Sequence, residues 1–195
     1  MKNPLSKNAF LVREHVGLFK AANNFDILDP ETGQVVLECR EEKLSFLTKF
    51  LRFSDYKRYT PFHVEIREPL GDTLIHIQRG VSLFLSNVEV RDEEQALLGR
   101  FKQKFFSIGG KFDVLSPNDE VLCELTGKWT GWNFSFAYQG IEFGRVSKEW
   151  SGIGMEFFTS ADNYVLSIDP SVEVDSPLRS LIMAAVMCID MVLKE

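Results

Sequence analysis

Cysteine is scarce in this sequence, and its spacing excludes two common uses of the residue. The 195 residues contain three cysteines, Cys39, Cys123 and Cys188. An odd number of widely separated cysteines predicts neither a disulfide framework nor a metal site built from CxxC pairs. The first ten residues are mostly polar and lack the apolar run of a secretory signal peptide. We therefore expect a reducing, cytoplasmic setting.

Positive charge is also in short supply, and familiar catalytic motifs are missing. The net charge of −6 and the pI of about 5.2 mean repulsion from phosphate backbones, so a nucleic-acid partner is not expected. The sequence contains no GxSxG, HExxH, GxxxxGK[ST] or GxGxxG pattern. Its three histidines are far apart, and His63 lies on the polar side of an alternating stretch, where we expect exposure. We predict no enzymatic site, and no cofactor apart from the calcium ion considered below.

Phenylalanine is abundant, with 17 residues, and 12% of all residues are aromatic. Aromatic side chains favour half-buried strands. Apolar residues alternate with polar ones at Phe62, Val64 and Ile66, and again from Trp132 to Tyr138. Turn-forming Pro, Gly, Asn and Asp residues separate such stretches at short intervals. This pattern predicts many short antiparallel strands, arranged as a barrel or a sandwich.

Two segments of the chain are similar to each other. Residues 25–30 (FDILDP) and 112–117 (FDVLSP) are each followed by a turn and a second short strand, and they start 87 residues apart. That separation is too long for a solenoid repeat. It predicts a single domain of two pseudo-symmetric halves, about 10–95 and 96–175, followed by a helix over 176–195. Chance similarity of two hairpins is the alternative.

The end of the chain differs in character from the rest. Ser176 and Pro177 suit the cap and first turn of a helix, and residues 181–189 are apolar on every face. A helix over residues 179–194 would be about 22 Å long, shorter than the roughly 30 Å of a bilayer core, and Asp190 would be costly there. We therefore predict that the strands close around this helix as a barrel. The helix residues expected in the core are Leu181, Ile182, Val186, Ile189 and Leu193.

Three linked segments resemble the phospholipid scramblase family in composition, order and spacing: SKEWSG at 147–152, FTSADNY at 158–164 and CID at 188–190. The resemblance extends upstream through LGRFKQKFF at 98–106 and is weakest over residues 1–22. It implies the Tubby C-terminal-like fold of the LURP-one-related superfamily, a closed antiparallel barrel of twelve strands threaded by the C-terminal helix. It also implies calcium-dependent movement of phospholipids between leaflets, with little headgroup selectivity.

The resemblance places a calcium loop at residues 160–171, just before the helix. Asp162 and Asn163 match oxygen ligands of that loop, and Asp169 could supply another. Calcium takes about six to eight oxygen ligands. Two acids and the turn glycine of the family loop are replaced here by Ser160, Ser171 and Val165. The alternative is a strand with an inward apolar face starting at Tyr164, followed by an acidic turn.

The candidate binding site for anionic lipid headgroups is a row of cations. Arg100, Lys102 and Lys104 alternate with other residues, so a strand would place all three on one face, and Lys111 follows shortly. A second group of cations lies among aromatic residues and comprises Lys49, Arg52, Lys57 and Arg58. The alternative for both groups is an ordinary solvated barrel face.

The favoured function is that of a scramblase-family protein. It would bind anionic phospholipid at the inner face of a membrane and take part in transbilayer phospholipid movement. The alternative is a soluble Tubby-like binding or structural module without lipid-moving activity. The proline-rich extension and the cysteine run of animal family members have no counterpart in the sequence, so membrane contact would be peripheral. The sequence leaves the oligomeric state open.

Overall fold

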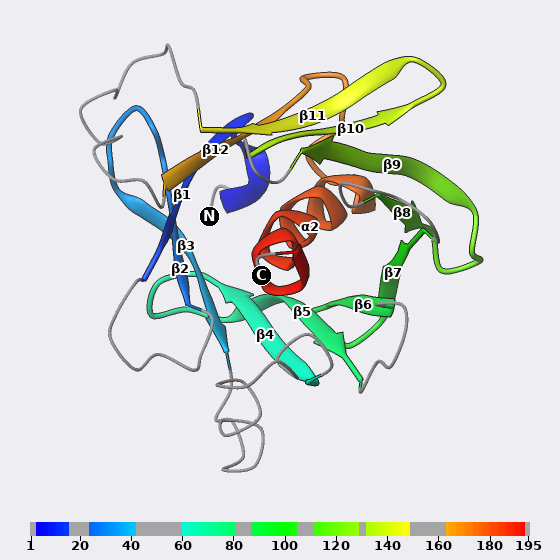
Figure 1. Cartoon of the computed structure of the whole chain (residues 1–195). Coiled ribbons are helices and arrows are strands. Elements are labelled where there is room, and N and C mark those ends of the chain that lie inside the picture. Colours follow the sequence, from blue (N-terminus) through cyan, green and yellow to red (C-terminus); the bar gives the residue numbers. More distant parts are fainter. Residues whose placement is uncertain are drawn as a thin grey trace.

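The strands form a closed barrel around one helix (Figure 1). The computed structural model describes residues 3–15, 24–41, 60–80, 87–104, 111–128, 132–148 and 163–193. These residues form a short 3₁₀ turn, η1 (Pro4–Ser6), twelve strands and the helix α2 (Pro177–Leu193). The strands are β1 (Ala9–Glu14), β2 (Phe25–Leu28), β3 (Val35–Glu41), β4 (Phe62–Arg67), β5 (Thr73–Arg79), β6 (Asn87–Asp92), β7 (Leu97–Gln103), β8 (Phe112–Leu115), β9 (Val121–Lys128), β10 (Asn133–Tyr138), β11 (Ile141–Ser147) and β12 (Asn163–Ile168).

Every strand pairs antiparallel with its neighbours in the sequence, and β12 completes the ring by pairing with β1. At the closure, Leu11 on β1 lies opposite Val165 on β12 and Leu28 on β2. A closed ring pairs both sides of every strand, so the edge groups of an open sheet are satisfied. The predicted closed antiparallel barrel is confirmed, and the sandwich alternative is wrong.

The period of two in the sequence becomes an inner and an outer face of the barrel. On β4, Phe62, Val64 and Ile66 are buried, whereas the polar residues between them are partly exposed. Strand β10 repeats this pattern with buried phenylalanines as far as Phe136. Tyr138 departs from it and is 38% exposed, because it is the last residue of β10 and lies beside a turn.

Helix α2 lies inside the ring of strands (Figure 1), as predicted. It begins at Pro177, and the Oγ of Ser176 caps it by accepting a hydrogen bond from the backbone N–H of Leu178 at 3.3 Å. Residues 181–189 are at most 7% exposed. Each large apolar side chain buried in this way contributes about 1.5–3 kcal/mol. Of the expected core positions, the side chain of Leu193 falls outside the part of the chain that is described.

No helix in the described part of the chain combines the length and the apolar character that crossing a bilayer requires. Helix α2 comprises 17 residues.

The two similar hairpins occupy matching places in the strand order. The first is β2 with β3 and the second is β8 with β9, so each begins at the second strand of a group of six. Both hairpins also carry a register shift near the end of their first strand. The division of the domain into two pseudo-symmetric halves remains a prediction that this correspondence supports.

The barrel wall and the helix approach each other closely at Gly99 on β7. A Cβ atom at this position would lie 2.2 Å from the carbonyl oxygen of Leu115 and 3.0 Å from the Cδ atoms of Leu181. The first of these contacts is to backbone on the paired strand β8, so side-chain rotation cannot relieve it. Glycine is therefore needed here to let the helix pack against the wall.

Arg179 ties the start of α2 to the N-terminal segment. Its side chain is 1% exposed, and it donates to the carbonyl oxygens of Leu5 (2.6 Å), Val172 (2.7 Å) and Lys7 (2.8 Å) and to the Oδ1 of Asn8. A cation near a helix N-terminus is disfavoured by the helix dipole. Because all four acceptors are uncharged, Arg179 contributes through these hydrogen bonds, and they close one end of the barrel.

Replacing Gly99 with alanine should destabilise the protein. The expected loss is about 1–3 kcal/mol in the free energy of unfolding, because the new methyl group overpacks the contact between β7, β8 and α2. Urea denaturation followed by circular dichroism measures it as a lower midpoint. Gly80→Ala is the control, since nothing lies within 4 Å of a Cβ built at Gly80. Equal midpoints for the two variants would contradict the close approach.

Replacing Arg179 with methionine should cost more, about 3–5 kcal/mol, because it leaves four acceptors at the barrel end without their donor. The matched control is Arg145→Met. Arg145 is an exposed arginine on β11 that pairs with Glu142 at 2.6 Å, and exposed pairs contribute about 0–1 kcal/mol. Chemical denaturation of both variants tests the difference. Arg179 would lose its assigned role if the two substitutions had the same effect.

Candidate lipid-binding surface

Strand β7 carries the predicted row of cations on the outside of the barrel. Phe101 points inward and is buried, whereas Arg100 and Lys102 on either side of it point outward. Lys104 follows the end of β7, and its backbone N–H donates to the carbonyl oxygen of Lys111 at 2.9 Å. The structure therefore gathers the four predicted headgroup ligands on one face, across β7 and the start of β8.

Two of these cations are already engaged by carboxylates. Arg100 Nη1 lies 3.0 Å from Asp119 Oδ1, and its Nε lies 3.8 Å from Glu89 Oε1. Lys104 Nζ lies 2.9 Å from both Asp113 Oδ1 and Glu124 Oε1. The hydrogen bonds that Lys104 donates to Asp113 and Glu124 raise its pKa. These side chains are held in a network that spans β6 to β9.

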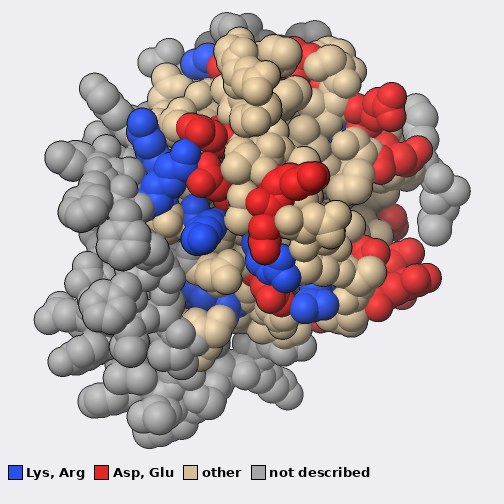
Figure 2. All heavy atoms as spheres, turned by 90° about the vertical axis from the view of Figure 1, so that its right-hand side faces the viewer, with Lys and Arg blue, Asp and Glu red and all other residues tan. Residues whose placement is uncertain are grey.

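The network balances its own charge. Arg100 and Lys104 contact four carboxylates, at Glu89, Asp113, Asp119 and Glu124, so the acids of the network equal in number the four cations of the row. Figure 2 views this side of the barrel and shows Lys and Arg side chains lying beside Asp and Glu side chains. The field of such a mixed face is weak beyond about one Debye length, roughly 8–10 Å. Sequence alternation located the cations, but it did not reveal the acids that neutralise them.

Lys102 differs from its neighbours in the row. It is exposed, and strand register places it opposite Asn87 on β6 and Asp113 on β8. Within the described ranges, Lys102 forms no ion pair, because Asp113 bonds to Lys104 instead. The second predicted group, at Lys49, Arg52, Lys57 and Arg58, lies outside the described residues.

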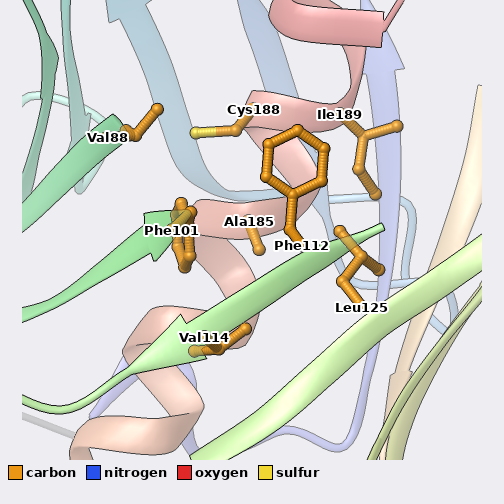
Figure 3. Close-up of a pocket in the computed structure, with 8 residues that line it drawn as sticks. All are labelled: Val88, Phe101, Phe112, Val114, Leu125, Ala185, Cys188 and Ile189. Carbon is orange, nitrogen blue, oxygen red and sulfur yellow. The ribbon is translucent and has the colours of Figure 1, made fainter. Parts of the chain in front are cut away.

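In the described part of the barrel, side chains fill most of the space around the last turns of α2. Side chains from four neighbouring strands face the last turns of α2 around a small apolar cavity (Figure 3). Its volume is about 10 Å³, close to the minimum that one water molecule needs. The lining residues are Val88, Phe101, Phe112, Val114, Leu125, Ala185, Cys188 and Ile189. This cavity cannot accept a phospholipid acyl chain, because ligand pockets usually measure about 300–1,000 Å³.

The expected calcium loop overlaps strand β12. Asn163 is the first residue of β12, and Asp169 follows its last, so their Cα atoms are about 20 Å apart at 3.3 Å per residue. Calcium binds oxygen at about 2.3–2.6 Å, so these two residues cannot share one ion. Tyr164 starts an inward apolar face of β12, as the strand alternative predicted. Asp162 lies outside the described residues.

Asp169 itself organises the turn after β12. Its Oδ1 accepts a hydrogen bond from the backbone N–H of Ser171 at 2.9 Å, and hydrogen bonding to Ser171 lowers the pKa of the carboxyl group. The backbone N–H of Asp169 donates to the carbonyl oxygen of Phe143 on β11 at 2.8 Å. These contacts account for an acid at this position without a metal ion.

The three cysteines are free and buried. Burial raises the pKa of Cys123 to about 12, and it raises the pKa values of Cys39 and Cys188 as well. Such thiols are poor nucleophiles, because the reactive species is the thiolate. The structure thus supports the expectation that these cysteines are not sites for attaching a lipid anchor.

Arg179 is a buried charged residue whose role the sequence did not predict. In the sequence, an arginine in the first turn of an apolar helix indicates only that this end of the helix is polar. The acceptors of Arg179 at residues 5–8 are more than 170 positions away in the sequence. A cation directly before a fully apolar run was the available signal. It could not indicate which backbone groups would receive its hydrogen bonds.

Comparisons with known proteins agree with this architecture. The family model described as Scramblase matches residues 9–195. Human phospholipid scramblase 2 is 23% identical over 187 residues, which is 88% of this chain and 60% of the human protein. The chain thus spans about 60% of the length of this relative. No solved structure matches significantly. Because the family model covers all twelve strands and the helix, the chain belongs to the scramblase family.

Proposed function

We propose that this protein binds anionic phospholipid at the cytoplasmic face of a membrane and takes part in transbilayer phospholipid movement. The observation that carries the proposal is the family match over residues 9–195, which includes all twelve strands and α2. The relative named phospholipid scramblase 2 adds support through its name, although this chain covers only part of its length.

Lipid would be handled on the outer surface of the barrel. In the described part of the interior, the cavity between the strands and α2 measures about 10 Å³, so an acyl chain has no room in it. The face formed by β7 and β8 is the best candidate for headgroup contact, because exposed Lys102 lies at its centre. Lysine near an anionic membrane surface contributes about 1 kcal/mol of attraction.

The paired cations of this face would contribute less than Lys102. A headgroup phosphate has to compete with Asp119 for Arg100 and with Asp113 and Glu124 for Lys104. We therefore expect this face to bind an anionic membrane weakly and in a salt-sensitive way, and not to anchor the protein strongly. Calcium is not required by this mechanism, since Asn163 and Asp169 are held apart by β12.

A second candidate function is a binding module that has the family fold but does not move lipid. The balanced charge of the face formed by β7 and β8 favours this second function, because a face without net charge can contact another protein as well as a membrane. Membrane binding and lipid movement must therefore be measured separately.

Sedimentation with phosphatidylserine-containing vesicles tests the binding step. We expect the protein to sediment at low ionic strength and to be released by about 0.5 M salt. The double variant Arg100→Glu with Lys102→Glu should bind several-fold less, and Asp119→Asn with Glu124→Gln should bind more, because it removes two of the carboxylates that neutralise the row. Arg145→Glu on β11 is the control for a charge reversal elsewhere. Identical binding by all four proteins would exclude this face.

Reconstitution into vesicles tests the lipid-moving step. With a fluorescent phospholipid in both leaflets and a reductant that bleaches only the outer one, active protein should raise the bleached fraction from about half towards completion. The assay is run with calcium and with a calcium chelator, and we expect similar rates in both. Sedimentation without any change in the bleached fraction would support the binding module and exclude scrambling by this domain alone.

A further inference from the structure

Two histidines and a glutamate meet on the outer face of the barrel, on β4 and β5, and β6 lies between them and the row on β7. His63 and Glu65 point outward from β4, and His76 points outward from the paired strand β5. Register places Glu65 directly opposite His76. One potential ligand atom from each of the three side chains lies within 4.8 Å of the other two. We call His63, Glu65 and His76 the imidazole–carboxylate cluster.

The distance between the His76 and Glu65 side chains fits two ligands of one metal ion better than it fits a hydrogen bond. His76 Nδ1 lies 3.5 Å from Glu65 Oε1, which is long for an N–H···O contact. Two ligands of a tetrahedral zinc ion lie about 3.3 Å apart, given bond lengths of about 2.0–2.2 Å. The rings of His63 and His76 are stacked with their centres 5.7 Å apart, so the His63 ring has to rotate for both histidines to bind the same ion.

The charges around the cluster leave Glu65 available for a cation. Arg40 lies opposite Glu65 on β3, but its Nη2 bonds to Asp26 at 2.6 Å and approaches Glu38 at 3.2 Å. Arg91 lies opposite His76 on β6, and it bonds to Glu89 at 2.8 Å. In the portion of the chain described, Glu65 pairs with no lysine or arginine.

The remaining contacts of Glu65 would support metal binding. The Oγ1 of Thr73 donates to Glu65 Oε2 at 3.2 Å and so orients the carboxylate from the second oxygen. The side chains of Glu65 and His76 are 23% and 12% exposed, so an ion can enter from solvent and keep a water ligand. Three protein ligands and one water form a common zinc arrangement.

We propose that His63, Glu65 and His76 bind a transition-metal dication, with Zn²⁺ as the fitting ion. Imidazole nitrogens suit zinc, copper and nickel, whereas calcium and magnesium prefer sites made of oxygen only. The bound ion would link β4 to β5 on the outside of the barrel. This site is independent of the proposed lipid function, because it lies on other strands than the row on β7.

Zinc binding is measured with the untagged full-length chain, after removal of metals with a chelator. Zn²⁺ is titrated in competition with a chromogenic zinc chelator. We expect one equivalent to bind, and His63→Gln and His76→Gln should each weaken binding about 10-fold or more. His15→Gln is the matched control, because His15 also contacts a carboxylate, Asp26, at 2.7 Å but has no second histidine beside it.

Thermal unfolding separates binding to the folded barrel from binding to cysteines in the unfolded chain. Zn²⁺ should raise the melting temperature of the wild type and of His15→Gln, but not that of Glu65→Gln or His76→Gln, whereas binding to the unfolded chain would lower it. Ca²⁺ should not displace Zn²⁺ at a 100-fold excess, an expectation based on ligand preference. No binding up to about 1 mM Zn²⁺, or equal affinity in the wild type and in both histidine variants, would overturn the proposal.

Discussion

The fold depends on burying an entirely apolar helix. Residues 181–189 of α2 expose at most 7% of any side chain, and twelve strands close around them. A barrel of this size needs its interior filled, and a helix without a polar face needs to be enclosed, so each element stabilises the other. The glycine at position 99 lets wall and helix meet, and Arg179 closes the end where the helix starts.

The interior is filled in the described part of the barrel, so the candidate sites found there lie on the outer face, where charge is distributed by strand register. Arg40 and Arg91 pair with carboxylates on a neighbouring strand and on the same strand, and Arg100 pairs with Asp119 in the turn between β8 and β9. This pairing keeps most of the surface close to neutral, and it explains why a row of three cations in the sequence is not a strongly basic patch in the structure. The imidazole–carboxylate cluster is the exception, because its glutamate has histidines as partners in place of an arginine.

The sequence was sufficient for the fold because fold information is local and periodic. Alternation at Phe62, Val64 and Ile66 predicted a strand with one buried face, and the apolar run of α2 predicted an enclosed helix. The number of strands came from the family resemblance and not from periodicity. The site was less predictable, since Asp119 pairs with Arg100 across 19 positions, and Glu65 meets His76 only through the register of β4 and β5. Pairings of this kind depend on turn lengths and bulges, which composition does not encode.

The exposure of the acids decides which paired cation can exchange its partner for a lipid phosphate. Asp119 has 70% of its side chain exposed, so its ion pair with Arg100 is well solvated and contributes little stability. Lys104 is held between two acids, and the side chain of one of them, Asp113, is only 20% exposed. Releasing Lys104 therefore leaves a partly buried carboxylate without its cation. Arginine also binds phosphate through two parallel hydrogen bonds, which lysine cannot do. If lipid binds this face, Arg100 is therefore the cation that changes partner at the lowest cost, and exposed Lys102 beside it adds charge without breaking any pair.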